Sequence, residues 1–242
     1  MPKTRNHRLK MTGMQPINTK PENQIKMNDS LKGNFSVFLY ECGCDEAGRG
    51  CLAGPVVAAA VILPLGFVCP LLNDSKQLTQ SVRDALRPVI EKEALAWAVA
   101  EVSNDEIDDM NILNASILAM HRAMDKLVIR PEFIIVDGNR FKSYGDVPYQ
   151  TIVKGDSKYL SIAAASVLAK THRDELMQQL HLEYPAFSWN QNKAYPTLAH
   201  RAAIRLNGTT PYHRLTFDLL GDIKKEARLK IMARKEAKKR RL

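Results

Sequence analysis

The stretch Gly43-Cys44-Asp45-Glu46-Ala47-Gly48-Arg49-Gly50 ends one apolar run and precedes another, which extends from Pro55 to Leu63. Two adjacent carboxylates are poor core residues, because an unpaired buried carboxylate is costly, so the pair predicts a bound cation or a reaction at a strand edge. The three glycines and the arginine around the pair indicate close approach by a polyanion. The sequence therefore predicts that the functional site is built around this stretch.

The positive charge of the chain lies at its two ends. The formal net charge of +9 favours a polyanionic partner. Residues 1–35 hold seven Lys and Arg against two acidic residues, and residues 223–242 hold ten against two, so the body between them is mildly acidic. We predict a disordered basic arm over 1–35, one catalytic domain over 36–222, and a basic C-terminal helix or tail over 223–242.

The cysteines and the apolar runs bear on location. The four cysteines lack the paired spacing of a zinc site and no signal peptide is recognisable ahead of them, which predicts reduced thiols in a cytoplasmic protein. The longest apolar stretch, Pro55 to Pro70, is interrupted by Pro64 and Gly66 and is shorter than the roughly 18 residues that a bilayer requires. No membrane partner is expected.

Alternating strand and helix patterns predict an α/β fold. Strand patterns cover 35–46, 56–63, 96–102, 133–136 and 149–153, and helical patterns cover 79–94, 112–128, 157–182 and 197–206. The first two strands are expected to form a hairpin with the carboxylates near its turn, and Pro88 predicts a kink or a break in the first helix. The loop over 183–196 contains Trp189, which we expect at the surface.

Three of the predicted strands end in carboxylates, at Asp45-Glu46, Asp137 and Asp156. Such strand ends can converge on one edge of an α/β sheet. Four neighbouring carboxylates repel one another unless divalent cations neutralise them, and oxygen ligands favour Mg²⁺ or Mn²⁺ over zinc. The chemistry that fits is two-metal phosphoryl transfer. The alternative is that each acid is an ordinary turn or cap residue.

The adjacency of Asp45 and Glu46 raises a geometric problem. Successive side chains of a regular strand point to opposite faces, so the two cannot both face one site from a regular strand. We therefore expect the strand to bend there, since residues 47–50 have the freedom to do so, and either a bulge or the end of the strand would reorient one of the two side chains.

Six segments between residues 38 and 218 together resemble the ribonuclease HII family. They are residues 43–56, Asn73-Asp74-Ser75-Lys76-Gln77-Leu78, Val136-Asp137-Gly138-Asn139-Arg140, Lys154-Gly155-Asp156, residues 161–174 from Ser161 through Ala169-Lys170 to Arg173-Asp174, and His213-Arg214-Leu215-Thr216-Phe217. The resemblance implies a ribonuclease H-like fold with a mixed sheet flanked by helices. It also implies cleavage of the RNA strand in RNA–DNA hybrids and nicking 5′ of single ribonucleotides in duplex DNA, leaving a 3′-hydroxyl and a 5′-phosphate.

The resemblance also implies roles for individual residues. Asp45, Glu46, Asp137 and Asp156 would be the catalytic, metal-binding carboxylates, with Mn²⁺ or Mg²⁺ as cofactor. Gly48, Arg49 and Gly50 would bind the scissile phosphate and the 2′-hydroxyl of the ribonucleotide, which is the group that distinguishes RNA from DNA.

Further substrate contacts follow from the same resemblance. Tyr195 would pack against the junction nucleotide, although Ala194 stands where the family usually has glycine. A requirement for positive φ there would cost about 1 kcal/mol with alanine. Lys76 and Lys154 lie in matched motifs and are expected to contact phosphates.

Two alternatives to this nuclease are open. A non-catalytic nucleic-acid-binding protein would use the basic tails but would not need the carboxylates. Another nuclease of the same fold, such as a junction resolvase, would lack the Gly48-Arg49-Gly50 and Tyr195 elements. The expected substrates are RNA–DNA hybrids and DNA containing ribonucleotides, and the expected protein is a monomer.

Overall fold

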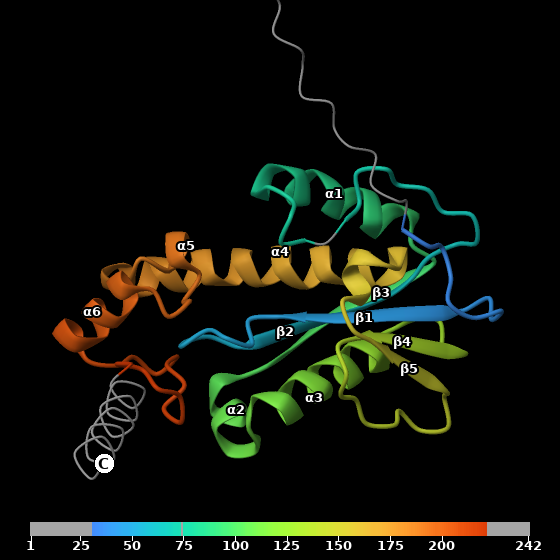
Figure 1. Cartoon of the computed structure of the whole chain (residues 1–242). Helices are drawn as coiled ribbons and strands as arrows, with labels where there is room; N and C mark the ends of the chain where they lie inside the picture. Colours follow the sequence, from blue (N-terminus) through green and yellow to red (C-terminus); the bar gives the residue numbers. More distant parts are fainter. Residues whose placement is uncertain (1–30, 74, 222–242) are drawn as a thin grey trace, which may run out of the picture. The chain divides into compact units, whose positions relative to one another are not determined.

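The structure, a computed structural model, describes residues 31–73 and 75–221, and within them a five-stranded mixed sheet (Figure 1). The order across the sheet is β3-β2-β1-β4-β5, so β1 lies in the centre. β1 pairs antiparallel with β2 and β2 antiparallel with β3, whereas β1–β4 and β4–β5 are parallel pairs. The predicted hairpin of the first two strands is confirmed. The strands are β1 (Glu41–Ala47), β2 (Val56–Ile62), β3 (Ala96–Val102), β4 (Phe133–Asp137) and β5 (Tyr149–Ile152).

Helices cover both faces of the sheet. Figure 1 shows α4 running along one face with α1 beside it, and α3 along the opposite face. The short helices α5 and α6 lie near the C-terminal end of α4. The helical elements are α1 (Gln80–Glu93), α2 (Asn104–Met110), α3 (Ile112–Asp125), α4 (Leu160–Glu183), α5 (Trp189–Asn192) and α6 (Leu198–Asn207), with 3-10 turns η1 (Gly155–Ser157) and η2 (Pro185–Phe187).

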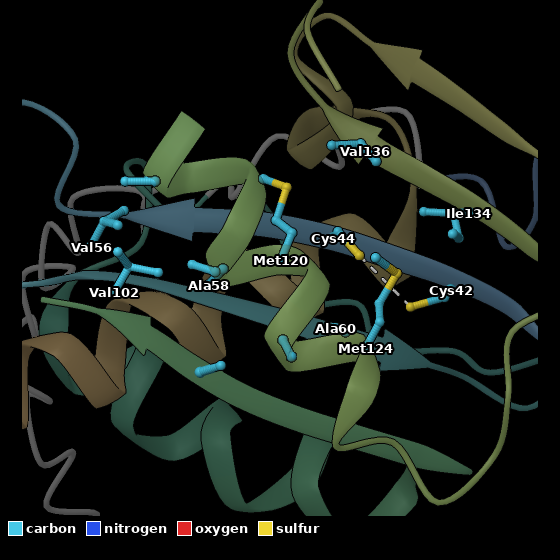
Figure 2. Close-up of a cluster of buried hydrophobic side chains, with 14 of the residues drawn as sticks. Cys42, Cys44, Val56, Ala58, Ala60, Val102, Met120, Met124, Ile134 and Val136 are labelled. Carbon is cyan, nitrogen blue, oxygen red and sulfur yellow. Dashed lines mark hydrogen bonds between the residues drawn. The ribbon is translucent and has the colours of Figure 1, made fainter. Parts of the chain in front are cut away.

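The two faces of β1 have different neighbours because side chains alternate along a strand. Cys42 and Cys44 point to the α3 face, where Figure 2 shows them packed near Met120 and Met124 of that helix. All four side chains are buried. The thiols are free, and their sulfur atoms lie 3.8 Å apart. This face of the sheet is therefore an apolar core.

The other face of β1 is held very close to α4. An added Cβ at Gly43 would lie 2.3 Å from the backbone carbon of Ser161 and 2.5 Å from the backbone nitrogen of Ile162. The next residues of α4, 163–165, are three buried alanines. Small side chains on both elements therefore bring the backbone of the helix onto the strand.

The start of the folded domain differs from the prediction. β1 begins at Glu41, not Phe35, because the carboxylate of Glu41 accepts hydrogen bonds from the backbone N–H groups of Phe35 and Ser36 and turns the chain. Phe35 stacks on Phe133, with ring centroids 5.8 Å apart. Lys32 N donates to the carbonyl of Lys158 over 2.8 Å. Residues 31–35, which we assigned to the arm, thus pack on the domain.

The helix starts follow local capping. Thr79 accepts a hydrogen bond from Val82 N, and Thr197 accepts one from His200 N, as expected of threonine at an N-cap. α1 continues through Pro88, so of the kink or break predicted there the break is wrong. The predictions for residues 1–30 and 222–242 lie outside the described residues. Within the described residues no helix has the length and apolar character needed to cross a bilayer.

Candidate active site

The parallel pairing of β1 with β4 brings two predicted acids together. The register pairs Cys44 with Val136, so Asp45 and Asp137 follow side by side at the ends of their strands. Asp156 joins them from η1, which comes three residues after β5. Asp45, Asp137 and Asp156 each offer one carboxylate oxygen within 4.8 Å of the others. Three of the four predicted carboxylates therefore form one cluster.

Backbone hydrogen bonds orient these carboxylates. Gly155 N donates to Asp137 Oδ1 over 2.7 Å, and Glu46 N donates to Asp45 Oδ1 over the same distance. Both bonds hold a carboxylate of the cluster in place through the backbone. The turn at η1 therefore fixes Asp137 as well as presenting Asp156.

Glu46 lies at the margin of this cluster. It is outside the group of three, and its Oε1 lies 3.1 Å from Arg49 Nη1. Of the two expected causes of reorientation, a bulge or the end of the strand, the bulge is wrong, because the β1–β2 register is regular through Asp45–Ala59, Glu46–Ala58 and Ala47–Val57. The parallel pairing with β4 ends one residue earlier, so Glu46 stands beyond the end of β4 and still lines the same cleft.

Burial makes the cluster electrostatically strained. The Asp45 side chain is buried, and its burial, the charge of Glu46 and the charge of Asp137 raise its pKa well above the usual value. Burial also raises the pKa of Glu46, and the guanidinium of Arg49 opposes that rise. Clustered carboxylate oxygens of this kind suit a hard divalent cation, which removes both the repulsion and the desolvation penalty. The donor set therefore fits Mg²⁺ or Mn²⁺.

A cleft of about 560 Å³ opens over the acids. Gly48, Arg49, Gly50, Lys76 and Tyr195, all predicted substrate-binding residues, line it with Asp45, Glu46 and Asp137. The remaining lining residues, which we did not assign to the site, are Ala47, Ser75, Arg83, Ser166 and Lys170.

The unassigned residues come from β1, from the segment before α1, from α1 itself and from α4. Ser166 and Lys170 lie four residues apart on α4, so they share one face of the helix. Ser75 Oγ lies 2.7 Å from Ser166 Oγ, and the carbonyl of Ser75 accepts a hydrogen bond from Arg83. The spacing of Ser166 and Lys170 could have identified this face, since both fall in a matched motif.

The two predicted lysine contacts differ in position. Lys76 Nζ lies 3.2 Å from Asp156 Oδ2, which places it at the carboxylate cluster itself. Lys154 is exposed, with a left-handed backbone (φ 56°), and does not line the cleft. Its carbonyl accepts hydrogen bonds from the backbone N–H and the hydroxyl of Ser157. Lys154 therefore shapes the turn that presents Asp156.

Tyr195 is 41% exposed and faces the cleft, from a backbone that is strained. Ala194 has φ 64° and Lys193 has φ 48°, so two consecutive non-glycine residues are left-handed. The sequence raised this possibility for Ala194, and the structure has that conformation. The Ala194 carbonyl accepts a hydrogen bond from Leu52 N over 2.8 Å, which ties the strained turn to the loop after β1.

We expect Ala194→Gly to raise the free energy of unfolding by about 0.5 kcal/mol. Relief of the positive φ gains roughly 1–2 kcal/mol, and loss of a fully buried methyl group removes about 0.8 kcal/mol. Urea unfolding of both proteins measures the difference. A loss of 1 kcal/mol or more, as an ordinary buried alanine would give, contradicts strain at this position.

Trp189 is fully buried, which corrects the prediction that it lies at the surface. Its indole N–H donates to His200 Nε2 over 3.0 Å. The proton of His200 therefore sits on Nδ1, which lies 3.1 Å from the carbonyl oxygen of Tyr195 and donates to it. His213 stacks beside this pair, with its ring centroid 5.5 Å from that of His200. A buried aromatic cluster thus supports the backbone of Tyr195.

Acid should unfold the protein partly through His213. Burial lowers the pKa of His213 to about 4, so the neutral ring favours the folded state above pH 6.5 and this contribution is lost as pH falls towards 4. The loss amounts to about 3 kcal/mol. His213→Asn keeps an acceptor for Thr210 N and cannot titrate in this range. The unfolding free energy should change less between pH 7 and pH 4.5 in this variant than in the unaltered protein. An equal change in both proteins would mean that His213 does not contribute to the loss of stability in acid.

Comparisons with known proteins agree on one family. The family model described as Ribonuclease HII matches residues 42–220. A Ribonuclease HII of Phocaeicola vulgatus is 68% identical over 183 residues, covering 76% of this chain and 91% of that protein. A Ribonuclease HII of Bacteroides thetaiotaomicron is 68% identical over 184 residues, covering 76% and 92%.

Solved structures give the same result for the fold. The ribonuclease H2 from Pyrococcus horikoshii OT3 has a TM-score of 0.62 at 26% identity, covering 78% of this chain and 98% of that chain. The ribonuclease HII in a PCNA complex from Archaeoglobus fulgidus has a TM-score of 0.61 at 24% identity, covering 74% and 96%. The expected α/β fold with a mixed sheet flanked by helices is confirmed.

Proposed function

The chain belongs to the ribonuclease HII family, and we propose that it nicks duplex DNA on the 5′ side of single embedded ribonucleotides through the cluster at Asp45. It is a metal-dependent endoribonuclease of ribonuclease H type 2 that acts on RNA–DNA hybrids. The proposal adds the position of the cut and the residues that make it.

One observation carries the assignment of the catalytic residues. Three carboxylates from β1, β4 and η1 place oxygen atoms within 4.8 Å of one another, at the edge of an open cleft. Asp45, Asp137 and Asp156 would hold the divalent ions, with Glu46 at the margin of the site. A pair of Mg²⁺ or Mn²⁺ ions bound there would supply the charge that activates water and stabilises the leaving oxygen.

The bond changes of the reaction are those of phosphodiester hydrolysis. Water adds to the phosphorus atom, the bond from phosphorus to the 3′ oxygen breaks, and that oxygen leaves as a hydroxyl. The products are a 3′-hydroxyl on the nucleotide upstream of the cut and a 5′-phosphate on the ribonucleotide. The proposal gives Gly48, Arg49, Gly50 and Tyr195 the task of placing the ribonucleotide, because they line the same cleft as the acids.

The arrangement of these residues supports sugar selection. The backbone of the glycine-flanked segment can approach a phosphate and a 2′-hydroxyl closely, and an exposed tyrosine ring can stack on a nucleotide. A non-catalytic binder has no use for buried carboxylates whose mutual repulsion destabilises the fold. The described cysteines are all free, which supports the expected cytoplasmic location, and we propose a monomer.

A duplex with one ribonucleotide tests the proposal. The protein is incubated with it and with the same duplex made entirely of DNA, each with Mg²⁺ or Mn²⁺. We expect one nick, on the 5′ side of the ribonucleotide, whose upstream end a DNA polymerase can extend because it carries a 3′-hydroxyl. Nicking of the all-DNA duplex at the same rate, or a cut on the 3′ side, contradicts the proposal.

A further inference from the structure

Two buried arginines contact the chain segments that carry the proposed recognition residues Gly48-Arg49-Gly50 and Tyr195. Arg173 of α4 and Arg214 of the C-terminal loop are 1% and 0% exposed. Within the described residues neither forms an ion pair with a carboxylate, and both donate to backbone carbonyls instead. Arginine side chains are rarely fully buried unless their guanidinium donors are paired. Their partners indicate what the two arginines do.

Arg173 connects two loops that are far apart in the sequence. Its Nε donates to the carbonyl of Pro55 over 3.1 Å, and its Nη2 donates to that of Ala53 over 3.1 Å. Its Nη1 donates to the carbonyl of Lys193 over 3.0 Å, two residues before Tyr195. One rigid guanidinium fork therefore sets the distance between the loop after β1 and the loop that carries Tyr195.

Arg214 contacts the Gly48-Arg49-Gly50 segment directly. Its Nη1 donates to the carbonyl of Arg49 over 3.1 Å, and its Nε donates to that of Gly54 over 3.0 Å. The backbone of Arg214 joins the same arrangement, because its N–H donates to the carbonyl of Leu52. Both ends of the 49–54 loop are therefore held by one side chain.

Gly48 is shaped to fit this arrangement. Its φ is 98°, and an added Cβ would lie 2.1 Å from Arg173 Nε. The turn at Gly48 therefore lies directly against the guanidinium, with no room for a side chain between them. We propose that Arg173 and Arg214 are positioning residues that hold Gly48-Arg49-Gly50 and Tyr195 as one rigid unit. This inference rests on the function proposed above. It identifies the side chains that align the Gly48-Arg49-Gly50 segment with Tyr195.

A double-mutant cycle tests the coupling. Arg173→Lys keeps the positive charge, but a single ammonium group cannot bond three separated carbonyls. We expect Arg173→Lys and Tyr195→Ala each to lower kcat/KM on the single-ribonucleotide duplex by at least about tenfold, since small displacements of positioning groups have large effects. The double variant should lie within about threefold of the worse single variant. Effects that multiply in the double variant overturn the proposal.

A general loss of stability needs a separate control. Ile90→Val removes one methylene group from a buried position on α1, away from both loops, and shows what destabilisation alone does to cleavage. Manganese activation provides the second control. Its midpoint should stay within about twofold in Arg173→Lys, because Arg173 contacts no carboxylate of the cluster. The proposal is overturned if the manganese midpoint shifts in Arg173→Lys. It is also overturned if Ile90→Val, compared at the same loss of melting temperature, loses as much cleavage activity as Arg173→Lys.

Amide hydrogen exchange tests the clamp without nucleic acid. Arg173→Lys should speed exchange in residues 48–55 and in residues 192–196 together, whereas Arg87→Lys on α1 should change neither. Faster exchange in only one loop, or in none, overturns the proposal whatever the activity. Should the unaltered protein fail to nick the ribonucleotide duplex, the proposed function fails by itself, and the exchange result still decides whether the clamp exists.

Discussion

Asp137→Asn is expected to reduce cleavage of the ribonucleotide duplex by more than about 100-fold. Loss of residues that only orient metal ligands already costs 10–100-fold, and Asp137 is a proposed ligand itself. Asparagine keeps the acceptor for Gly155 N, so the turn at η1 should persist. Single-turnover cleavage at saturating Mn²⁺ measures the effect. Activity within tenfold of the unaltered protein contradicts the proposed role of Asp137.

The same variant is expected to lose activity without losing stability. Asp137 contributes to the raised pKa of Asp45, so removing its charge relieves repulsion inside a buried cluster. Without divalent metal, Asp137→Asn should melt at the same temperature as the unaltered protein or higher. The rise in melting temperature that Mn²⁺ produces should shrink in the variant, because ligand-linked stabilisation follows affinity. Asp84→Asn, on the exposed side of α1, is the matched control and should change neither quantity.

Gly43→Ala is expected to have the largest effect on stability, a loss of about 3 kcal/mol or more. The new Cβ would meet the backbone of Ser161 and Ile162 at 2.3–2.5 Å, and backbone atoms cannot rotate away as a flexible side chain can. Overpacking of a tight core costs 1–3 kcal/mol and occasionally more. Because Gly43 lies two residues before Asp45 on the same face of β1, the helix shift that relieves the clash also displaces the cleft.

Urea unfolding and cleavage rates together check this expectation. Gly50→Ala is the control for stability, because no atom lies within 4 Å of a Cβ added there. The unfolding free energy of Gly50→Ala should therefore stay within about 1 kcal/mol of the unaltered value. If Gly43→Ala behaves like Gly50→Ala in urea, then α4 does not press on β1 as closely as described.

Local signals in the sequence predicted the elements well where they were strong. Thr79 and Thr197 mark helix starts because their hydroxyls cap the helix locally, and β3 was predicted over its observed length, 96–102. α2 was missed because it is a seven-residue helix with little apolar periodicity. β1 was predicted too early because Phe35 and Phe38 look like strand residues, whereas their rings pack on Phe133 from a loop.

The positions of the four acids could be predicted from the sequence, but their arrangement in space could not. Acids at strand ends indicated a metal cluster, but which three converge depends on the parallel register of β1 and β4. Burial of Trp189 depends on His200 of another helix. The roles of Arg173 and Arg214 were beyond prediction for a similar reason, since arginine is usually exposed and their partners are backbone carbonyls.

The mixed sheet also determines when the carboxylate cluster can form during folding. The β1–β2 hairpin closes through residues 48–55, whereas Asp45 meets Asp137 and Asp156 across about 90 and 110 residues of chain. Contacts of such long range form slowly, because the entropy of loop closure must be overcome first. We therefore expect a chain emerging from the ribosome to carry a folded hairpin well before it can bind a catalytic ion. The carboxylate cluster therefore cannot form until the chain has been synthesised beyond Asp156.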